Sequence, residues 1–256
     1  MTATRVVVTD DGPVRVLTLS GPGRLNSLAA ATADALCEEV QRAEYEDRIR
    51  ALVLTGEGRH FSAGGDAAGV IDAAASGEDD AMIRFMRSYH RAALAVWGSS
   101  LPVVACVSGV AYGGAFNLAL SCDLVVCSKE VRFSQVFLRM GVVPDFGGAF
   151  LLPRLVGMQR AKEMILLPDE IDAATAHRLG LVNTVTEAPE QALDEALAVA
   201  HRIAEQSRMA VSMTKRLMNS STGGSYESSL ELEALSQASA MGASAAQASF
   251  ARFGSR

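Results

Sequence analysis

Short runs of apolar residues divide the first half of the chain into predicted strands. Val6–Thr9 and Val14–Leu19 flank the polar turn Asp10-Asp11-Gly12-Pro13, a pattern typical of a β-hairpin. Similar apolar runs predict further strands at Ala51–Thr55, Val103–Val107, Leu124–Cys127 and 131–133. Helical segments alternate with these strands, and Gly-rich turns follow several of them, so the pattern predicts an α/β fold.

Helical periodicity fills the gaps between the predicted strands. Leu28, Leu36 and Val40 lie on one side of a predicted helix that begins at a cap, Asn26 or Ser27, and ends near residue 45. A second helix is predicted at about 81–97. Between these helices, residues 70–80 are small and acidic, which predicts a loop.

The second half of the chain is helical almost throughout. Helices are predicted at about 147–156, 158–167, 172–179, 189–206, 208–220 and 225–252. Gly223-Gly224 marks the clearest break between two of them. The last segment is rich in Ala, Ser and Met and has only a sparse apolar stripe, which favours an oligomer contact over a free surface helix.

A charge-free segment extends from Ala92 to Cys122 and is long enough to raise the question of a membrane span. Its composition argues against one, because Pro102, Ser108-Gly109 and Gly113-Gly114 interrupt any helix. We interpret the segment as a buried strand, a glycine turn and a short helix, and we expect no membrane association.

Composition and charge restrict the class of protein. The chain has 256 residues, 49% of them hydrophobic and 20% charged, as in a globular protein. Its net charge of −6 argues against nucleic-acid binding. The N-terminus has no secretory signal pattern, and the four cysteines are too scattered for a metal site or disulfide framework. A cytoplasmic, reduced location is therefore expected.

Two glycine turns remain as candidate functional features after standard motifs are excluded. The sequence contains no phosphate-binding loop, no nucleophile elbow, no complete dinucleotide fingerprint and no zinc-ligand spacing of histidines. Gly64-Gly65 and Gly113-Gly114 each follow a predicted strand, and the second pair opens a helix. Glycine lets a backbone N–H approach a ligand closely, so two such turns can form an oxyanion hole. Alternatively, both are only tight turns.

Two aspartates lie close to these features. Asp145 precedes a predicted helix in an apolar setting, where it is either a turn or capping residue or a carboxylic acid with a raised pKa that shuttles protons. Asp66 follows the first glycine pair and is expected to cap the helix after it rather than to perform chemistry.

At this point the sequence resembles the crotonase, or enoyl-CoA hydratase/isomerase, superfamily over nearly its whole length. The similarity rests on several segments in their order and spacing: 24–28 (RLNSL), 61–66 (FSAGGD), 110–115 (VAYGGA), 121–123 (SCD) and 180–182 (GLV). The resemblance implies a ClpP-like spiral of ββα turns with a C-terminal helical trimerisation region. We assign residues 1–195 to the acyl-CoA-binding core and 196–256 to oligomerisation, and we expect a homotrimer or a hexamer made of two trimers.

The resemblance also assigns roles to individual residues. Superfamily members bind acyl-CoA thioesters and hold the thioester oxygen with two backbone N–H groups, which match Gly65 and Gly114. Substrate contacts are expected at Arg24, Leu25, Ser62, Ala63, Asp66, Gly113, Asn117 and Phe137. Coenzyme A is then part of the substrate, and no metal, nicotinamide or flavin is expected.

Departures from the superfamily pattern indicate the reaction. Hydratases of the superfamily use two glutamates, and the matching positions here hold Asn117 and Phe137, neither of which is a general base. Asp145 matches the acid/base aspartate of several isomerases, including those of 2-(1,2-epoxy-1,2-dihydrophenyl)acetyl-CoA. The sequence therefore favours an acyl-CoA isomerase, with a hydratase or another lyase of the superfamily and a non-catalytic acyl-CoA-binding paralogue as alternatives.

Overall fold

The computed structural model describes residues 4–242 and 250, except residues 22, 24 and 79. Its strands are β1 (Arg5–Asp11), β2 (Val14–Ser20), β3 (Ala51–Gly56), β4 (Val103–Val107), β5 (Val110–Tyr112), β6 (Leu124–Ser128), β7 (Arg132–Ser134), β8 (Ile171–Asp172) and β9 (Thr184–Thr186). Its helices are α1 (Ala30–Glu44), α2 (Ala67–Ala75), α3 (Ala81–Gly98), α4 (Gly114–Leu120), the 3-10 helix η2 (Val136–Met140), α5 (Gly148–Val156), α6 (Met158–Leu166), α7 (Ala173–Arg178), α8 (Pro189–Ala204), α9 (Arg208–Ser221) and α10 (Tyr226–Met241).

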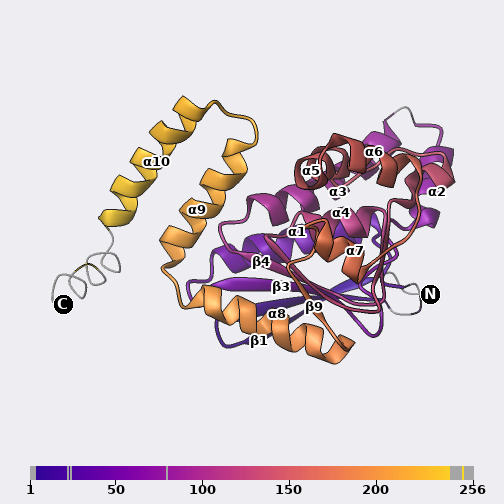
Figure 1. The fold of residues 1–256 in the computed structure, drawn as a ribbon. Coiled ribbons are helices and arrows are strands. Elements are labelled where there is room, and N and C mark those ends of the chain that lie inside the picture. The colour runs from indigo at the N-terminus through magenta and orange to yellow at the C-terminus, as the bar shows by residue number, and fades with distance from the viewer. Residues whose placement is uncertain (1–3, 22, 24, 79, 243–249, 251–256) are drawn as a thin grey trace.

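A six-stranded sheet forms the centre of the molecule, in the order β1-β2-β3-β4-β6-β9 (Figure 1). β1 and β2 pair as the predicted antiparallel hairpin, with Asp11 opposite Val14, and the remaining strands pair in parallel. Side chains alternate between the two faces of a strand. In β3, Leu52 and Leu54 therefore face one core and Val53 faces another.

Helices cover both faces of this sheet (Figure 1). α1 and α3 pack on the face that carries Leu52 and Leu54. α8 covers the opposite face with Ala192, Ala196 and Ala200, all with no exposed area. The small alanine side chains let the α8 backbone approach the strands closely. Parallel strands buried on both faces explain the continuous apolar runs in the sequence.

A smaller sheet, β5-β7-β8, gives the fold its spiral form. The chain enters the large sheet through β4 and the small sheet through β5, and then forms α4. It repeats this path through β6 and β7. The turn of the spiral that precedes β4 also passes from the large sheet to the small one, because Ser62, which follows β3, forms a parallel bridge with Ala111 of β5. Successive turns therefore bring the segments after β3 and β4 together, as the ββα spiral predicts.

The charge-free segment is divided among α3, β4, β5 and α4. β4 has the predicted bounds, and all of its residues are buried. In the part of the chain that the structure describes, no helix has both the length and the apolarity needed to cross a membrane.

Two local predictions in the first half are wrong. α1 begins at Ala30 rather than at a cap formed by Asn26 or Ser27. Asn26 instead lies at φ 53° and donates its side-chain amide to the carbonyls of Glu57 and His60. The predicted loop at 70–80 is partly helical, because α2 covers Ala67–Ala75. Its alanines favour a helix, and the break comes only at Ser76 and Gly77.

The C-terminal region forms an arm, α9 and α10, that extends from the body of the molecule (Figure 1). α10 contains no buried residue. The boundary expected between residues 195 and 196 falls inside α8, which packs on the large sheet, so the projecting arm begins later, at α9. The end of the predicted helix at 225–252 lies largely outside the described residues.

Candidate active site

The two glycine turns meet in the structure. The segment that starts at Ser62 runs beside β5: the Ser62 N–H donates to the Val110 carbonyl at 3.1 Å, and the Tyr112 N–H donates to the Ser62 carbonyl at 3.2 Å. A Cβ atom on Gly64 would lie 2.5 Å from the Tyr112 carbonyl oxygen and 3.5 Å from the Gly114 nitrogen. Glycine at position 64 is therefore what permits this close approach of two backbones.

The backbone geometry leaves two N–H groups of these turns available. Leu28 pairs in parallel with Gly65: its N–H donates to the Gly64 carbonyl at 2.8 Å, and its carbonyl accepts from the Asp66 N–H at 2.9 Å. In this pairing the Gly65 N–H is directed away from Leu28. Gly114 is the first residue of α4, where backbone amides have no partner within the helix. Within the described residues, neither of these two N–H groups donates a hydrogen bond.

Asp145 lies beside the second turn. A Cβ atom on Gly114 would be only 2.8 Å from Asp145 Oδ1, so the absence of a side chain at 114 makes room for the carboxyl group. Oδ1 is buried and has no hydrogen-bond partner among the described residues. Burial raises the pKa of Asp145 from 3.8 to about 7, because the ionised carboxylate loses hydration, and a hydrogen bond from its own backbone offsets only part of this loss. This carboxyl group can therefore exchange a proton near neutral pH.

Two aromatic rings hold the Asp145 segment in place. Phe146 is buried and stacks on Tyr89 of α3, with ring centroids 4.7 Å apart. The Tyr89 hydroxyl donates to the Leu28 carbonyl, which links the rings to the Gly64-Gly65 turn. Phe146 has φ 46°, an uncommon conformation for a bulky residue, which persists because the surrounding packing fixes it. Neither residue was predicted as part of the site, since nothing in the local sequence pattern distinguishes them from ordinary core aromatics.

Asn117 and Gln135 form a buried polar pair behind Asp145. The Asn117 amide donates to the Asp145 carbonyl at 2.9 Å, and Gln135 Nε2 donates to Asn117 Oδ1 at 2.8 Å. Asn117 has no exposed area. Its side chain contacts the Asp145 backbone and Gln135, and no part of it is accessible at the surface of the site. Gln135 was not predicted as a site residue, although an amide between Phe133 and Phe137 in a buried segment is a signal that could have indicated it.

Several expected substrate contacts lie along the first turn. Ser62 is fully buried, and its hydroxyl donates to the Asn26 carbonyl at 2.8 Å and accepts from the Gly64 N–H at 3.1 Å. The Ser62 side chain therefore stabilises the Gly64-Gly65 turn through hydrogen bonds on its buried side. Leu25 is 43% exposed, and its carbonyl accepts from the Ala63 N–H at 2.9 Å.

The remaining predicted residues fall at the edges of the site. Asp66 occupies the cap position of α2, as expected, but its side chain makes no capping hydrogen bond there. The Gly113 N–H donates to the Ser134 carbonyl at 2.9 Å, and a Cβ atom at Gly113 would lie 3.4 Å from the Phe137 ring. Phe137 therefore places an apolar surface against the second turn. Arg24 lies outside the described residues.

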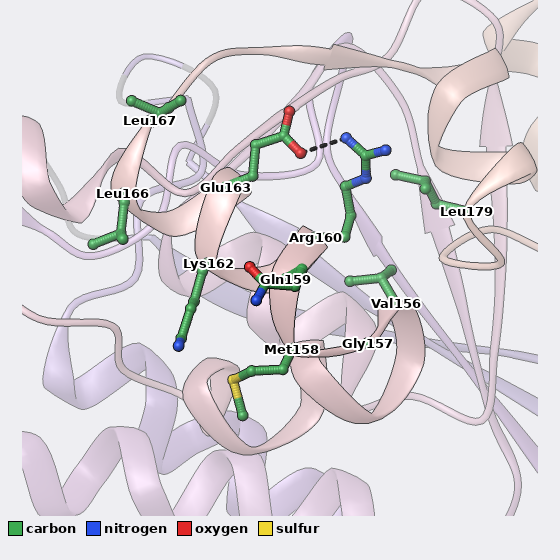
Figure 2. Close-up of a pocket in the computed structure, with 10 residues that line it drawn as sticks. All are labelled: Val156, Gly157, Met158, Gln159, Arg160, Lys162, Glu163, Leu166, Leu167 and Leu179. Atoms are coloured by element: carbon green, nitrogen blue, oxygen red, sulfur yellow. Dashed lines mark hydrogen bonds and ion pairs between the residues drawn. The ribbon is translucent and has the colours of Figure 1, made fainter.

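A separate hollow of about 990 Å³ lies on α5 and α6 (Figure 2). Arg160 and Glu163 line it and form an ion pair with one another along α6. Exposed apolar side chains such as Leu166 and Leu167 complete the lining. Neither of the two glycine turns, at 64–65 and 113–114, lines this hollow, nor does Asp145. We therefore place the candidate active site at the glycine turns.

The described residues contain no group of three or more His, Cys, Asp or Glu side chains that could hold a metal ion. The four cysteines are buried and free, as the sequence indicated. Burial raises the pKa of the Cys106 thiol to about 11 and that of the Cys127 thiol to about 12, so both stay protonated and unreactive at neutral pH.

Comparisons with known proteins identify the family of this chain. The family model described as "Enoyl-CoA hydratase/isomerase" matches residues 10–254. A 1,2-epoxyphenylacetyl-CoA isomerase from Escherichia coli K12 is 33% identical over 86% of this chain and 84% of its own length. A short-chain-enoyl-CoA hydratase from Clostridium acetobutylicum is 32% identical over 86% of this chain and 82% of its own.

A solved structure shows the same fold. The crystal structure of an enoyl-CoA hydratase from Polaromonas sp. JS666 superposes with a TM-score of 0.93 at 31% identity, and the match covers 98% of each chain. The mixed α/β spiral, its two glycine turns and these matches all agree. The chain therefore belongs to the enoyl-CoA hydratase/isomerase family, the crotonase superfamily that its motifs indicated.

Proposed function

We propose that this protein is an acyl-CoA isomerase that shifts a double bond, or rearranges the acyl part of a CoA thioester, through an enolate. The observation that carries the proposal is the position of Asp145: a single buried carboxyl group, with a pKa near 7, beside the backbone of Gly114. A group with this pKa is present in both protonation states near neutral pH and can therefore accept and return a proton.

The proposed reaction needs one carboxylate and two N–H donors. For a 3-enoyl-CoA, Asp145 removes a proton from C2, and the electron pair of that C–H bond moves toward the thioester oxygen. The N–H groups of Gly65 and Gly114 stabilise the developing negative charge on this oxygen. The electrons then return to form the C2–C3 double bond, and the π electrons of the C3–C4 double bond take the proton of the Asp145 carboxyl group at C4, so that this double bond becomes a single bond. The proton balance is complete, and the scheme requires no metal, nicotinamide or flavin.

The surroundings of Asp145 favour isomerisation over hydration. Asn117 and Phe137 occupy the positions that would hold the two glutamates of a hydratase, and neither side chain activates water. The buried rings of Phe137 and Phe146 surround the second turn with apolar surface. Restricting water near the enolate favours its reprotonation over addition of water.

Hydration of an enoyl-CoA is the second candidate, because relatives of similar identity carry the name of hydratases. A hydratase of this sequence would have to use Asp145 in place of the glutamate pair. A third possibility is that the chain keeps the glycine turns only to bind acyl-CoA, without turnover.

The test compares the wild-type protein with Asp145→Asn and with a control, Asp172→Asn, at an exposed carboxylate that caps α7. A panel of 3-enoyl-CoA thioesters is followed for formation of the 2-enoyl product, and acyl-CoA thioesters are followed for α-proton exchange in deuterated water. We expect Asp145→Asn to lose about 10²–10⁴-fold in kcat/KM while still binding acyl-CoA, because a general acid–base group contributes about that much. The control is expected to match the wild type.

The alternative functions give different results in the same experiment. Rapid addition of water to crotonyl-CoA by the wild type would favour a hydratase. Binding of acyl-CoA without α-proton exchange would favour a non-catalytic protein. Full turnover by Asp145→Asn would contradict the role proposed for this residue.

A further inference from the structure

The side chain of Asn117 joins three segments that are distant in the sequence. Asn117 lies in α4, its amide donates to the backbone carbonyl of Asp145 ahead of α5, and its Oδ1 accepts from Gln135 after β7. Asn117 has no exposed area and Gln135 is 1% exposed. The hydrogen bond between Gln135 and Asn117 is therefore shielded from water, and the one from Asn117 to the Asp145 carbonyl is partly buried.

The Asp145 peptide is fixed from two sides. Its carbonyl accepts from the Asn117 amide at 2.9 Å and from the Gly148 N–H at 3.0 Å. Gly148 packs directly on the Asn117 amide, since a Cβ atom at 148 would lie 2.2 Å from Asn117 Nδ2. By contrast, Oδ1 of the Asp145 carboxyl group has no partner. The position of this carboxyl group is therefore set largely through the backbone that carries it.

The Asp145 carbonyl and Gln135 together hold the Asn117 amide in one orientation. The carbonyl can only accept, so it requires Asn117 Nδ2, and Asn117 Oδ1 then faces Gln135, whose Nε2 donates to it. A carboxylate at position 117 could not make the second contact, because it has no proton to donate to a carbonyl. It would also add a buried negative charge near Asp145.

We infer that Asn117, held by Gln135, is a positioning residue that holds the Asp145 peptide so that the carboxyl group stays beside the Gly114 backbone. This inference rests on the proposed function of Asp145. Asn117 therefore differs from a hydratase glutamate in more than its lack of a carboxylate. Its amide also holds the acid/base residue Asp145 in place through a hydrogen bond to the Asp145 carbonyl.

The groups that face Asp145 define what a pH profile reports. Tyr89 of α3 faces it. Burial and the charges of Asp145 and Asp66 raise the pKa of this phenol well above its usual range, although a hydrogen bond with the Asp66 backbone lowers it, so Tyr89 stays neutral. Asn117 and Gln135 do not titrate. The acidic limb of kcat/KM therefore reports the ionisation of Asp145, and a displaced Asp145 peptide changes its midpoint.

Two variants remove the proposed contacts one at a time. Asn117→Asp keeps the shape of the side chain but loses the donor to the Asp145 carbonyl. Gln135→Met has nearly the same size and loses the donor to Asn117. Gln135→Met also removes Oε1, a buried acceptor without a partner among the described residues, so it is expected to fold even if Asn117→Asp does not.

We expect Asn117→Asp to lower kcat by about 10- to 100-fold, since a small misplacement of a catalytic group has effects of this size. KM is expected to change less than threefold, and the acidic midpoint of kcat/KM is expected to rise, because a second carboxylate disfavours ionisation of Asp145. Gln135→Met is expected to lower kcat by a smaller factor at an unchanged KM. Circular dichroism and thermal melts establish that the samples compared are folded.

Asp145→Asn is measured in parallel so that the two hypotheses can be separated. If Asp145→Asn retains α-proton exchange, the proposed function fails. If Asp145→Asn is inactive while folded Asn117→Asp and Gln135→Met keep wild-type kcat and an unchanged pH midpoint, the positioning role is overturned and the proposed function stands. A fall in kcat at an unchanged KM in folded Gln135→Met supports the inference, because this variant adds no charge near Asp145, whereas the shifted midpoint of Asn117→Asp reports the added carboxylate.

Discussion

Burial of the Asp145 carboxyl group has a consequence for stability that does not depend on any substrate. The pKa of this group rises from 3.8 to about 7 because burial removes hydration from the ionised form. Each pKa unit corresponds to about 1.4 kcal/mol, so the ionised carboxylate costs the native state about 4 kcal/mol relative to the unfolded chain. Replacing Asp145 by Asn removes this cost.

The sign of the pH dependence follows from proton binding. Between the two pKa values the native state holds the Asp145 proton and the unfolded state releases it. The native state therefore binds more protons, and stability falls as pH rises through this window. Below pH 3.8 the free-energy cost of burying the ionised Asp145 carboxylate is absent, and above about pH 7 it is fully present. Between pH 5.5 and pH 8 it grows by about 2 kcal/mol.

The measurement is urea unfolding of the wild type and Asp145→Asn at pH 5.5 and pH 8, at one protein concentration. We expect the stability difference between the two proteins to shift by about 2 kcal/mol in favour of Asp145→Asn at the higher pH. Contributions from other titrating groups are shared by both proteins and cancel in this comparison. Asp145→Asn should therefore gain stability at pH 8 while it loses activity, as expected when a catalytic group is held in a costly environment.

Asp172→Asn is the matched control. Hydrogen bonds from Thr175 lower the pKa of Asp172, so this exposed carboxylate is ionised in both states throughout the window. Its effect on stability is expected to be the same at both pH values. A pH-independent difference for Asp145→Asn as well would refute the reasoning, because it would mean that the Asp145 carboxylate is not penalised by burial.

Two further predictions concern the C-terminal arm. The buried ammonium group of Lys215 in α9 donates to the carbonyls of Val96 and Leu101 and, at 2.7 Å, to Asp123 Oδ2, whose side chain is 26% exposed. Lys215→Met removes the donor from these acceptors and should lower the free energy of unfolding by about 1–3 kcal/mol, measured by urea. An unchanged midpoint would contradict this estimate. We also propose that exposed apolar residues of α10, such as Leu230 and Leu235, pack between copies of the chain; sedimentation should then give the mass of three or six chains, and a monomeric mass would exclude this assembly.

Much of the fold could be predicted because its signals are local. The apolar run at Val103–Val107 becomes β4 with the same bounds, and the helices from α5 to α9 begin and end within about one or two residues of their predicted limits. Predictions that depended on competing local signals were less successful. Asn26 has the chemistry of a helix cap, but its amide is used by the carbonyls of Glu57 and His60, more than thirty residues away.

In the candidate site, too, some features follow from local sequence and others from contacts between distant segments. Residue types and their spacing along the chain were enough to indicate the family, the two glycine turns and the candidate aspartate. Folding was needed to show that Asn117 faces the Asp145 backbone, that Gln135 donates to Asn117, and that Phe146 has a positive φ. Each of these depends on contacts between segments brought together by folding and on burial that strengthens an otherwise weak interaction. Burial is also what changes Asp145 from an ordinary acid into one that exchanges a proton near neutral pH.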